Sequence, residues 1–203
     1  MARVRTAVLI SGRGSNLASL IEASRAPGYP AEIVLVISNK ADAGGLAIAE
    51  QAGIPTKAIP HKQFVSREEF DAAVDAALRD ADVSLVCEAG FMRIHSEWFV
   101  RRWEGRILNI HPSLLPAFPG IHVHEQALAA GAKMSGCTVH FLTAELDSGP
   151  IIRQATVPVL PDDTPDTLAA RVLEQEHKLY PEGLRLVATG KVKLENGRAI
   201  FAS

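Results

Sequence analysis

The chain has 203 residues, of which 47% are hydrophobic, and a formal net charge of −2 at pH 7. This size and composition favour one folded domain with at most a small appendage, and the near-neutral charge gives no reason to expect nucleic acid or an anionic membrane as a partner. Cys87 and Cys137 form no Cys-x-x-Cys pair, no apolar run approaches the roughly 20 residues of a membrane span, and no signal pattern precedes the first strand, so we expect a cytoplasmic protein.

Strands and helices alternate through the first half of the chain. Apolar, β-rich runs predict buried strands over residues 4–10, 33–37, 83–86 and 107–110. Helical spacing of apolar residues predicts helices over residues 16–23, 44–51, 66–81 and 97–103. The helix that begins at Ser66 is the clearest, because Ser66 and Glu69 have the spacing of a capping box. This alternation is typical of a largely parallel sheet covered by helices on both faces.

The second half of the chain is richer in strands. We expect a helix over residues 125–130, strands over 138–142 and 151–160, and a long helix from Thr164-Pro165 to Tyr180. Asn196-Gly197 predicts a hairpin turn between strands at 192–194 and 199–201. The fold class is therefore α/β and Rossmann-like, with a mostly parallel central sheet and a mixed or antiparallel C-terminal part. Residues 1–190 would form a single domain, and residues 191–203 a C-terminal hairpin extension.

A glycine-rich turn, Ser11-Gly-Arg-Gly-Ser-Asn16, follows the first strand and opens the first helix. Such a turn directs free backbone N–H groups at an anion, although a tight turn with Ser15 as helix N-cap is an equal alternative. A dinucleotide fits poorly, because Leu17 stands where a third glycine would be needed and no acid follows the second strand in Ser38-Asn39-Lys40. A single phosphate is the better interpretation.

The most informative segment is Leu108-Asn-Ile-His-Pro-Ser-Leu-Leu-Pro116, where an apolar strand ends in polar residues. Ligands of α/β domains bind at the carboxyl ends of strands. Asn109 and His111 are two residues apart and so point to the same side of their strand, towards one reacting group. Pro112 and Pro116 stiffen the loop that follows.

Five histidines lie between residues 95 and 140, namely His95, His111, His122, His124 and His140. A metal site is one interpretation, but no His-Glu-x-x-His or Cys/His spacing supports it. We therefore expect no metal, and we favour hydrogen-bonded structure or pocket lining for His122, His124 and His140.

Several charged residues have two interpretations each. Asp147 lies in the turn 145–150 and is either an ordinary turn residue or a carboxylate that approaches His111 and orients its ring. Glu176 follows the apolar stripe of the late helix and is either a solvated flank or an acid that faces a ligand. Arg67 and Arg93 are candidates for binding an anion, although exposed arginines are commoner.

Four motifs occur in the order Ser11–Asn16, Ala89-Gly-Phe-Met-Arg-Ile94, Leu108–Pro116 and Glu145-Leu-Asp147, followed by Gln175-Glu-His177. From the first strand to this last helix, the chain resembles the folate-dependent phosphoribosylglycinamide formyltransferases of purine biosynthesis. The Asn-x-His-Pro-Ser core is shared with methionyl-tRNA formyltransferase and formyltetrahydrofolate hydrolase. The Gly-Ser-Asn turn and the Gln-Glu-His helix narrow the resemblance to the glycinamide ribonucleotide enzymes.

The resemblance implies a role for each matching residue. Asn109, His111 and Asp147 would be catalytic. The ribonucleotide would be bound by Gly14, Ser15, Asn16, Leu173, Glu174, Gln175 and Glu176, with the phosphate at the turn and the amine at Glu176. The folate would contact Arg67, Met92, Arg93, Ile94, His95, Asn109, Glu145, Leu146 and Asp147. The phosphate site would belong to the N-terminal half of the domain, and the folate site and catalytic loops to the C-terminal half.

The implied reaction moves a formyl group from 10-formyltetrahydrofolate, as co-substrate, to the amine of 5′-phosphoribosylglycinamide, with no metal. The partners would be these small molecules, with no nucleic acid and no membrane, and the chain would be a monomer or a homodimer. A hydrolase or a catalytically silent nucleotide-binding module is the alternative. The sequence departs from the family pattern at Arg13, Glu88, His95 and Ser148, and a buried Glu88 would need a partner.

Overall fold

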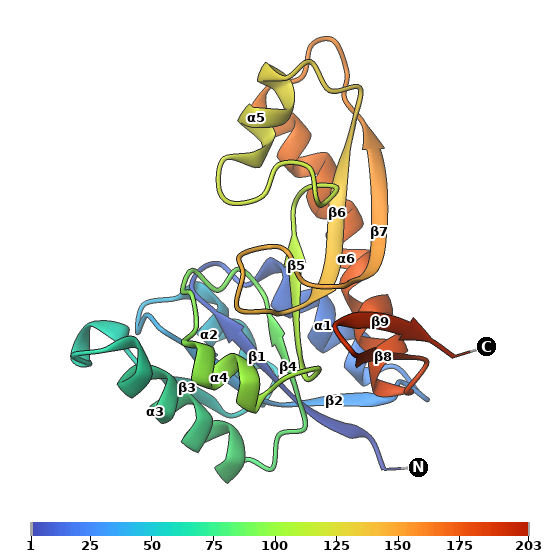
Figure 1. Cartoon of the computed structure of the whole chain (residues 1–203). Helices are drawn as coiled ribbons and strands as arrows, with labels where there is room; N and C mark the ends of the chain where they lie inside the picture. Colours follow the sequence, from blue (N-terminus) through green and yellow to red (C-terminus); the bar gives the residue numbers. More distant parts are fainter. Residues whose placement is uncertain (1, 203) are drawn as a thin grey trace.

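The computed structural model describes residues 2–202, and its centre is a sheet of seven strands in the order β3-β2-β1-β4-β5-β6-β7 (Figure 1). The first five strands in sequence pair in parallel, and the last two pair antiparallel. The strands are β1 (Val4–Ile10), β2 (Ala31–Ser38), β3 (Thr56–Ala58), β4 (Leu85–Glu88), β5 (Ile107–His111), β6 (Met134–Phe141) and β7 (Ile151–Pro158). This topology confirms the predicted Rossmann-like sheet with a mixed C-terminal part.

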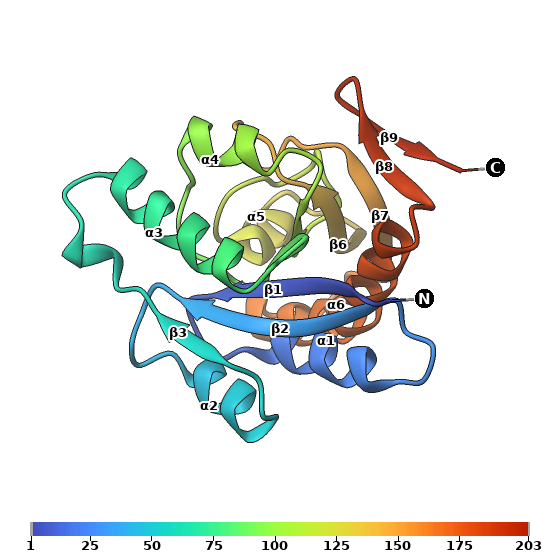
Figure 2. The ribbon, with the colours of Figure 1, turned by 90° about the horizontal axis from the view of Figure 1, so that it is seen from below.

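Helices cover both faces of the sheet, as Figure 2 shows, with α3 and α4 on one face and α1, α2 and α6 on the other. The helices are α1 (Ser15–Arg25), α2 (Gly44–Gln51), α3 (Arg67–Asp80), α4 (Glu97–Arg102), α5 (Val123–Ala129) and α6 (Pro165–Ala188), with a 3-10 turn at η1 (His61–Gln63). Each face has its own buried apolar cluster, one around Phe70 and Phe99 and the other around Leu17 and Tyr180. Within residues 2–202, no helix combines the length and apolar character that a membrane crossing requires.

Helix α6 is longer than the sequence predicts. We expected it to end at Tyr180, but it continues through Pro181 to Ala188. The helix continues because its last turns are buried against the sheet. A Cβ placed on Gly183 would lie 2.8 Å from Val139 Cγ1, and Leu184 is fully buried. This packing outweighs the backbone hydrogen bond that a proline cannot donate.

Local turn chemistry departs from the prediction in three places. The N-cap of α1 is Gly14 in a left-handed conformation, whereas Ser15 is the first helical residue. At α3, the Ser66 hydroxyl accepts from the Glu69 N–H as expected, but the Glu69 carboxylate accepts from the N–H of Val65 rather than of Ser66. Strand β3 was not predicted, because three half-exposed residues leave no apolar pattern.

The predicted C-terminal hairpin is present as β8 (Val192–Glu195) and β9 (Arg198–Phe201). Asn196 and Gly197 have φ angles of 50° and 71°, as the predicted tight turn requires. The hairpin is a separate two-stranded sheet beside the C-terminal end of α6 (Figure 1). Val192 is fully buried and so joins the hairpin to the apolar cluster around Tyr180.

The Tyr180 hydroxyl connects α6 to the sheet, since its oxygen lies 2.8 Å from the Glu88 carbonyl and 2.9 Å from the Leu108 carbonyl. We expect Tyr180→Phe to lower the free energy of unfolding by about 1–3 kcal/mol, because two buried carbonyls lose their donor. Urea denaturation measures this change. The matched control is Tyr29→Phe, which removes one bond to the Pro181 carbonyl and should cost about 0.5–1.5 kcal/mol. Equal stability of Tyr180→Phe and the native chain would contradict the prediction.

Candidate active site

A pocket of about 540 Å³ opens where β4 and β5 end. Its wall combines the segment after β4, the end of β5, the loop 120–124, the loop 142–147, and one residue each from α1 and α6. Strand ends of parallel sheets are the usual ligand sites of α/β folds. The pocket takes residues from both halves of the chain.

Eleven of the residues predicted to form the site line this one pocket. They are Asn16, Met92, Arg93, Ile94, His95, Asn109, His111, Glu145, Leu146, Asp147 and Glu176. The other predicted residues, Gly14, Ser15, Arg67, Leu173, Glu174 and Gln175, do not line it. Gln175 instead lines a separate groove with residues 151–155 of β7.

The turn before α1 requires glycine for two reasons. Gly14 has a φ of 81°, and a Cβ at this position would lie 2.7 Å from the Gly45 Cα at the start of α2. No side chain caps α1, and its first turn contains no acidic residue. The N–H groups of this turn therefore have no side-chain acceptor, which is the arrangement that an anion site uses.

Asn16 and Glu176 form a pair at one end of the pocket, although 160 positions separate them in the sequence. The Asn16 amide donates to a Glu176 carboxylate oxygen at 2.7 Å. Burial raises the pKa of Glu176, and the bond from Asn16 partly opposes this shift. The buried Oδ1 atom of Asn16 has no partner within residues 2–202. Of the two interpretations of Glu176, the structure therefore supports the acid that faces a ligand.

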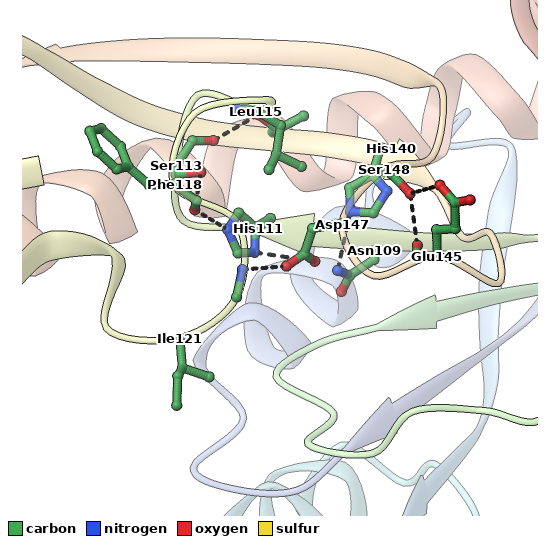
Figure 3. A network of polar contacts seen from close by, with 12 residues as sticks. Asn109, His111, Ser113, Leu115, Phe118, Ile121, His140, Glu145, Asp147 and Ser148 are labelled. Carbon is green, nitrogen blue, oxygen red and sulfur yellow. Dashed lines mark hydrogen bonds and ion pairs between the residues drawn. The ribbon is translucent and has the colours of Figure 1, made fainter. Parts of the chain in front are cut away.

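Asn109 lies on β5 opposite His140 on β6, and Figure 3 shows the two side chains in contact. The Asn109 Nδ2 atom is 3.3 Å from His140 Nε2, and His140 Nδ1 is 2.9 Å from the Phe141 carbonyl. Because a carbonyl can only accept, Nδ1 carries the ring proton and Nε2 accepts from the amide. Burial lowers the pKa of His140, which favours this neutral ring. The second N–H of the Asn109 amide is left to face the pocket.

His140 is hydrogen-bonded structure, one of the two alternatives that we expected for it, and it does not line the pocket. The sequence did not reveal that its partner is Asn109. The signal that identifies this partner is the antiparallel register of β5 and β6, which places Asn109 opposite His140. Register depends on pairing between distant segments and is not visible in the sequence.

The His111 ring is held between two acceptors (Figure 3). Its Nε2 atom lies 3.0 Å from the Phe118 carbonyl, and its Nδ1 atom lies 3.4 Å from the Asp147 carboxylate. The other Asp147 oxygen accepts from the Gly120 N–H at 2.8 Å. Asp147 thus contacts both His111 and the loop after it, as the functional interpretation of this residue predicted.

Backbone strain gathers in the two loops that meet at Asp147. Asp147, Phe118 and His122 have φ angles of 49°, 53° and 57°, in the left-handed region that L-residues seldom adopt. Such conformations persist only where surrounding contacts hold them. Here Thr138 contributes, since its hydroxyl donates to the Ser113 carbonyl at 2.7 Å and accepts from the Leu115 N–H.

The segment after β4 forms an apolar side of the pocket. The Ser11 hydroxyl accepts from the Met92 N–H at 2.8 Å and so attaches this segment to the end of β1. Four large apolar side chains lie exposed around the pocket, which suits a flat aromatic ligand. They are Met92, Ile94, Ile121 and Leu146.

Glu88 and His95, two departures from the family pattern, lie against each other in the pocket wall. His95 Nε2 is 2.9 Å from a Glu88 carboxylate oxygen, and His95 Nδ1 donates to Asp71 of α3 at 2.6 Å. The ring is also stacked between Phe91 and Phe99. Burial lowers the pKa of His95, but its bonds to the two carboxylates outweigh this and raise the pKa to about 9. Glu88 therefore has the buried partner that the sequence required.

The part of the chain that the structure describes contains no group of side chains that could bind a metal ion. Within residues 2–202, no three or more His, Cys, Asp or Glu side chains are grouped closely enough to hold an ion. The side chains of the pocket instead offer an amide, an imidazole and carboxylates as hydrogen-bonding and proton-transfer groups.

The raised pKa of His95 predicts how stability depends on pH. Since the folded-state pKa is about 9 and the ordinary value is 6.5, the charged ring stabilises the fold fully below pH 6.5. This contribution should be lost as the pH rises from 6.5 through 9. We expect the unfolding free energy of the native chain to fall over this range relative to Glu88→Leu/His95→Leu, which keeps every other titrating group. Parallel curves in denaturant titrations would contradict the prediction.

Both the sequence and the structure of this chain are similar to those of known formyltransferases. Residues 4–184 match the family model described as formyl transferase. The chain is 47% identical to the phosphoribosylglycinamide formyltransferase of Escherichia coli, over 95% of this chain and 91% of that protein. A solved glycinamide ribonucleotide transformylase from Symbiobacterium toebii superposes with a TM-score of 0.96 at 46% identity, over 99% of this chain and 95% of that one.

Longer relatives match as well. The chain is 56% identical to the trifunctional purine biosynthetic protein adenosine-3 of Gallus gallus over 95% of its own length, but it spans only 19% of that protein. The family match therefore concerns one unit that also occurs inside longer proteins. Because the match covers nearly the whole sheet and all the loops that build the pocket, the chain belongs to the formyl transferase family.

Proposed function

We propose that this protein transfers the formyl group of 10-formyltetrahydrofolate to the amine of 5′-phosphoribosylglycinamide. The products are the N-formyl ribonucleotide and tetrahydrofolate. The observation that carries the proposal is a single pocket that has Asn109, His111 and Asp147 as a reactive group and the Asn16–Glu176 pair as an amine site. The relatives named for this activity support it.

The two substrates would approach from different sides of the pocket. The ribonucleotide phosphate would bind at the turn from Gly14 to Asn16, with Leu173, Glu174 and Gln175 close to the ribonucleotide and its amine at Glu176. The folate ring would lie against residues 92–95, with Leu146 across from them and Arg67 nearer its tail. The exposed apolar side chains of Met92, Ile94 and Leu146 support this placement, since they would be covered by the ligand.

The reaction requires a bond between the amine nitrogen and the formyl carbon, followed by cleavage of the bond from that carbon to N10 of the folate. A neutral amine must attack, and the Glu176 carboxylate accepts a hydrogen bond from it and aims its lone pair. The tetrahedral centre that forms carries a negative oxygen. The free N–H of Asn109, whose amide His140 orients, donates to this oxygen. Such donors contribute on the order of a hundred- to a thousandfold in rate.

The proton that the amine loses must reach N10 so that the folate leaves. His111 lies in the pocket wall and relays this proton, while Asp147 holds the ring from the side of Nδ1. General acid–base assistance of this kind contributes about a hundred- to ten-thousandfold.

A hydrolase is the main alternative, because the same reactive group could deliver the formyl group to water. The Asn16–Glu176 pair favours transfer, since water needs no buried acid at the far end of the pocket. The absorbance change of a 10-formyl folate, measured with and without glycinamide ribonucleotide, separates the two. Signal only with the ribonucleotide supports transfer, and signal without it supports hydrolysis. A lack of signal in both cases would favour a binding module.

The roles of His111 and Asn109 are tested by removing each side chain. We expect His111→Ala to lower kcat by about a hundred- to ten-thousandfold and Asn109→Ala by about a hundred- to a thousandfold. The KM for the ribonucleotide should change by less than about threefold, because neither group holds the ground state. Steady-state kinetics gives both values. Near-normal kcat in either variant would remove that residue from the mechanism.

Glu176→Ala should weaken ribonucleotide binding by about tenfold or more, since a hydrogen bond to a charged group contributes roughly 1.5–3 kcal/mol. Folate affinity should remain within about threefold of the native value. Calorimetric titration with each substrate alone measures both. Glu182→Ala is the matched control, because Glu182 lies on the same helix and pairs with Arg153 outside the pocket. Loss of folate binding instead would show that the two subsites are reversed.

A further inference from the structure

The Glu88–His95 pair changes the chemistry of one pocket wall. Both side chains are almost completely buried, and both line the pocket. The surrounding residues Phe91, Val100 and Leu142 are apolar. A carboxylate in such a place costs several kcal/mol unless hydrogen-bond donors surround it. His95 lies between the carboxylates of Glu88 and Asp71. The hydrogen bonds that each carboxylate accepts therefore indicate which ligand groups the wall can bind.

The two carboxylates beside His95 are satisfied to different degrees. Asp71 accepts from His95 Nδ1 at 2.6 Å and from the Ser96 N–H at 2.5 Å. Glu88 Oε1 lies 2.9 Å from His95 Nε2, but neither of these buried atoms has a hydrogen-bond partner within residues 2–202. Of the two carboxylates, Glu88 lines the pocket and Asp71 does not.

The pairing of β4 with β5 places Glu88 beside Asn109. Glu88 is the last residue of β4 and is paired with Asn109 on β5. Adjacent strands lie roughly 4.8 Å apart, so a folate whose formyl group meets Asn109 has its ring system within reach of the Glu88 wall. A ligand here would have to offer N–H donors, because the buried Glu88 carboxylate is an acceptor whose Oε1 atom has no hydrogen-bond partner within residues 2–202.

We propose that the Glu88 carboxylate, oriented by His95, accepts hydrogen bonds from the 2-amino and N3–H groups of the pterin and so selects a 2-amino-4-oxo ring. The inference rests on the proposed folate-dependent function. These two N–H groups lie side by side on the ring, in the fork that matches a carboxylate and that a guanidinium also presents. Glu88 is thus a binding residue, and His95, which acts through Glu88, is a positioning residue.

The test compares two quinazoline folate analogues that differ only at position 2, where one carries an amino group and the other a methyl group. Calorimetry at pH 7 gives the dissociation constant of each for the native chain and its variants. We expect the native chain to bind the 2-amino analogue about 10- to 100-fold more tightly, as a charge-assisted hydrogen bond implies. Glu88→Gln should reduce this ratio about tenfold, and Glu88→Leu/His95→Leu should bring it within threefold of unity.

The controls separate a lost contact from a lost fold. Glu97→Gln makes the same chemical change at an exposed residue of α4 that pairs with Arg101, and it should keep the native ratio. Ribonucleotide affinity should stay native in every variant. If the double variant does not fold, the ratios of the two dissociation constants for the native chain and for Glu88→Gln still decide the question. Glu88→Gln replaces a carboxylate by an amide of nearly the same size, so the packing of the pocket wall is kept.

Two results would overturn the inference. One is equal binding of both analogues by the native chain, and the other is a native ratio in Glu88→Gln or in a folded double variant. Either would leave the proposed function intact. Binding of neither analogue would overturn the proposed function, and this inference with it.

Discussion

The contact of Tyr180 with two neighbouring strands is the constraint on which the site depends. Its hydroxyl reaches the carbonyl of Glu88, the last residue of β4, and the carbonyl of Leu108, which directly precedes Asn109 on β5. Because Tyr180 lies one turn after Glu176 on α6, this contact also sets the depth of Glu176 in the pocket. The amine site, the oxyanion donor after Leu108 and the Glu88 wall are therefore held in one frame.

That frame explains why charged groups can be buried in the pocket. Glu176 is paired with Asn16, Asp147 with His111 and Gly120, and His95 with two carboxylates. Most of these pairs join segments that are distant in sequence, and all of them form only when the chain is folded. Fixed groups of this kind act on charge that develops in a reaction without first having to reorient, as water would. Part of the cost appears as the strained backbone at Asp147.

The reactive group combines rigid and adaptable parts. Asn109 and His140 lie on paired strands of the central sheet, and their geometry is set by the register of β5 and β6. Asp147 and the partner of His111, Phe118, lie in loops. In the proposed reaction, the oxyanion donor must be fixed, whereas the groups proposed to pass a proton must also let two substrates enter. Placing Asn109 on a strand and Asp147 in a loop meets both requirements.

Much of this protein could be predicted from its sequence, because strand and helix periodicity and short turn signals are local. The parallel sheet, the hairpin at Asn196-Gly197 and the placing of Asn109 and His111 at a strand end all depend on neighbours in the chain. Local patterns singled out Asp147 in its turn and Glu176 beside an apolar stripe, but each kept two interpretations until the family resemblance implied a role. By contrast, the passage of α6 through Pro181, the orientation of Asn109 by His140 and the position of His95 between Glu88 and Asp71 were decided only by the tertiary structure. They rest on packing and hydrogen bonds between residues far apart in sequence, and a local pattern carries no information about which distant groups meet.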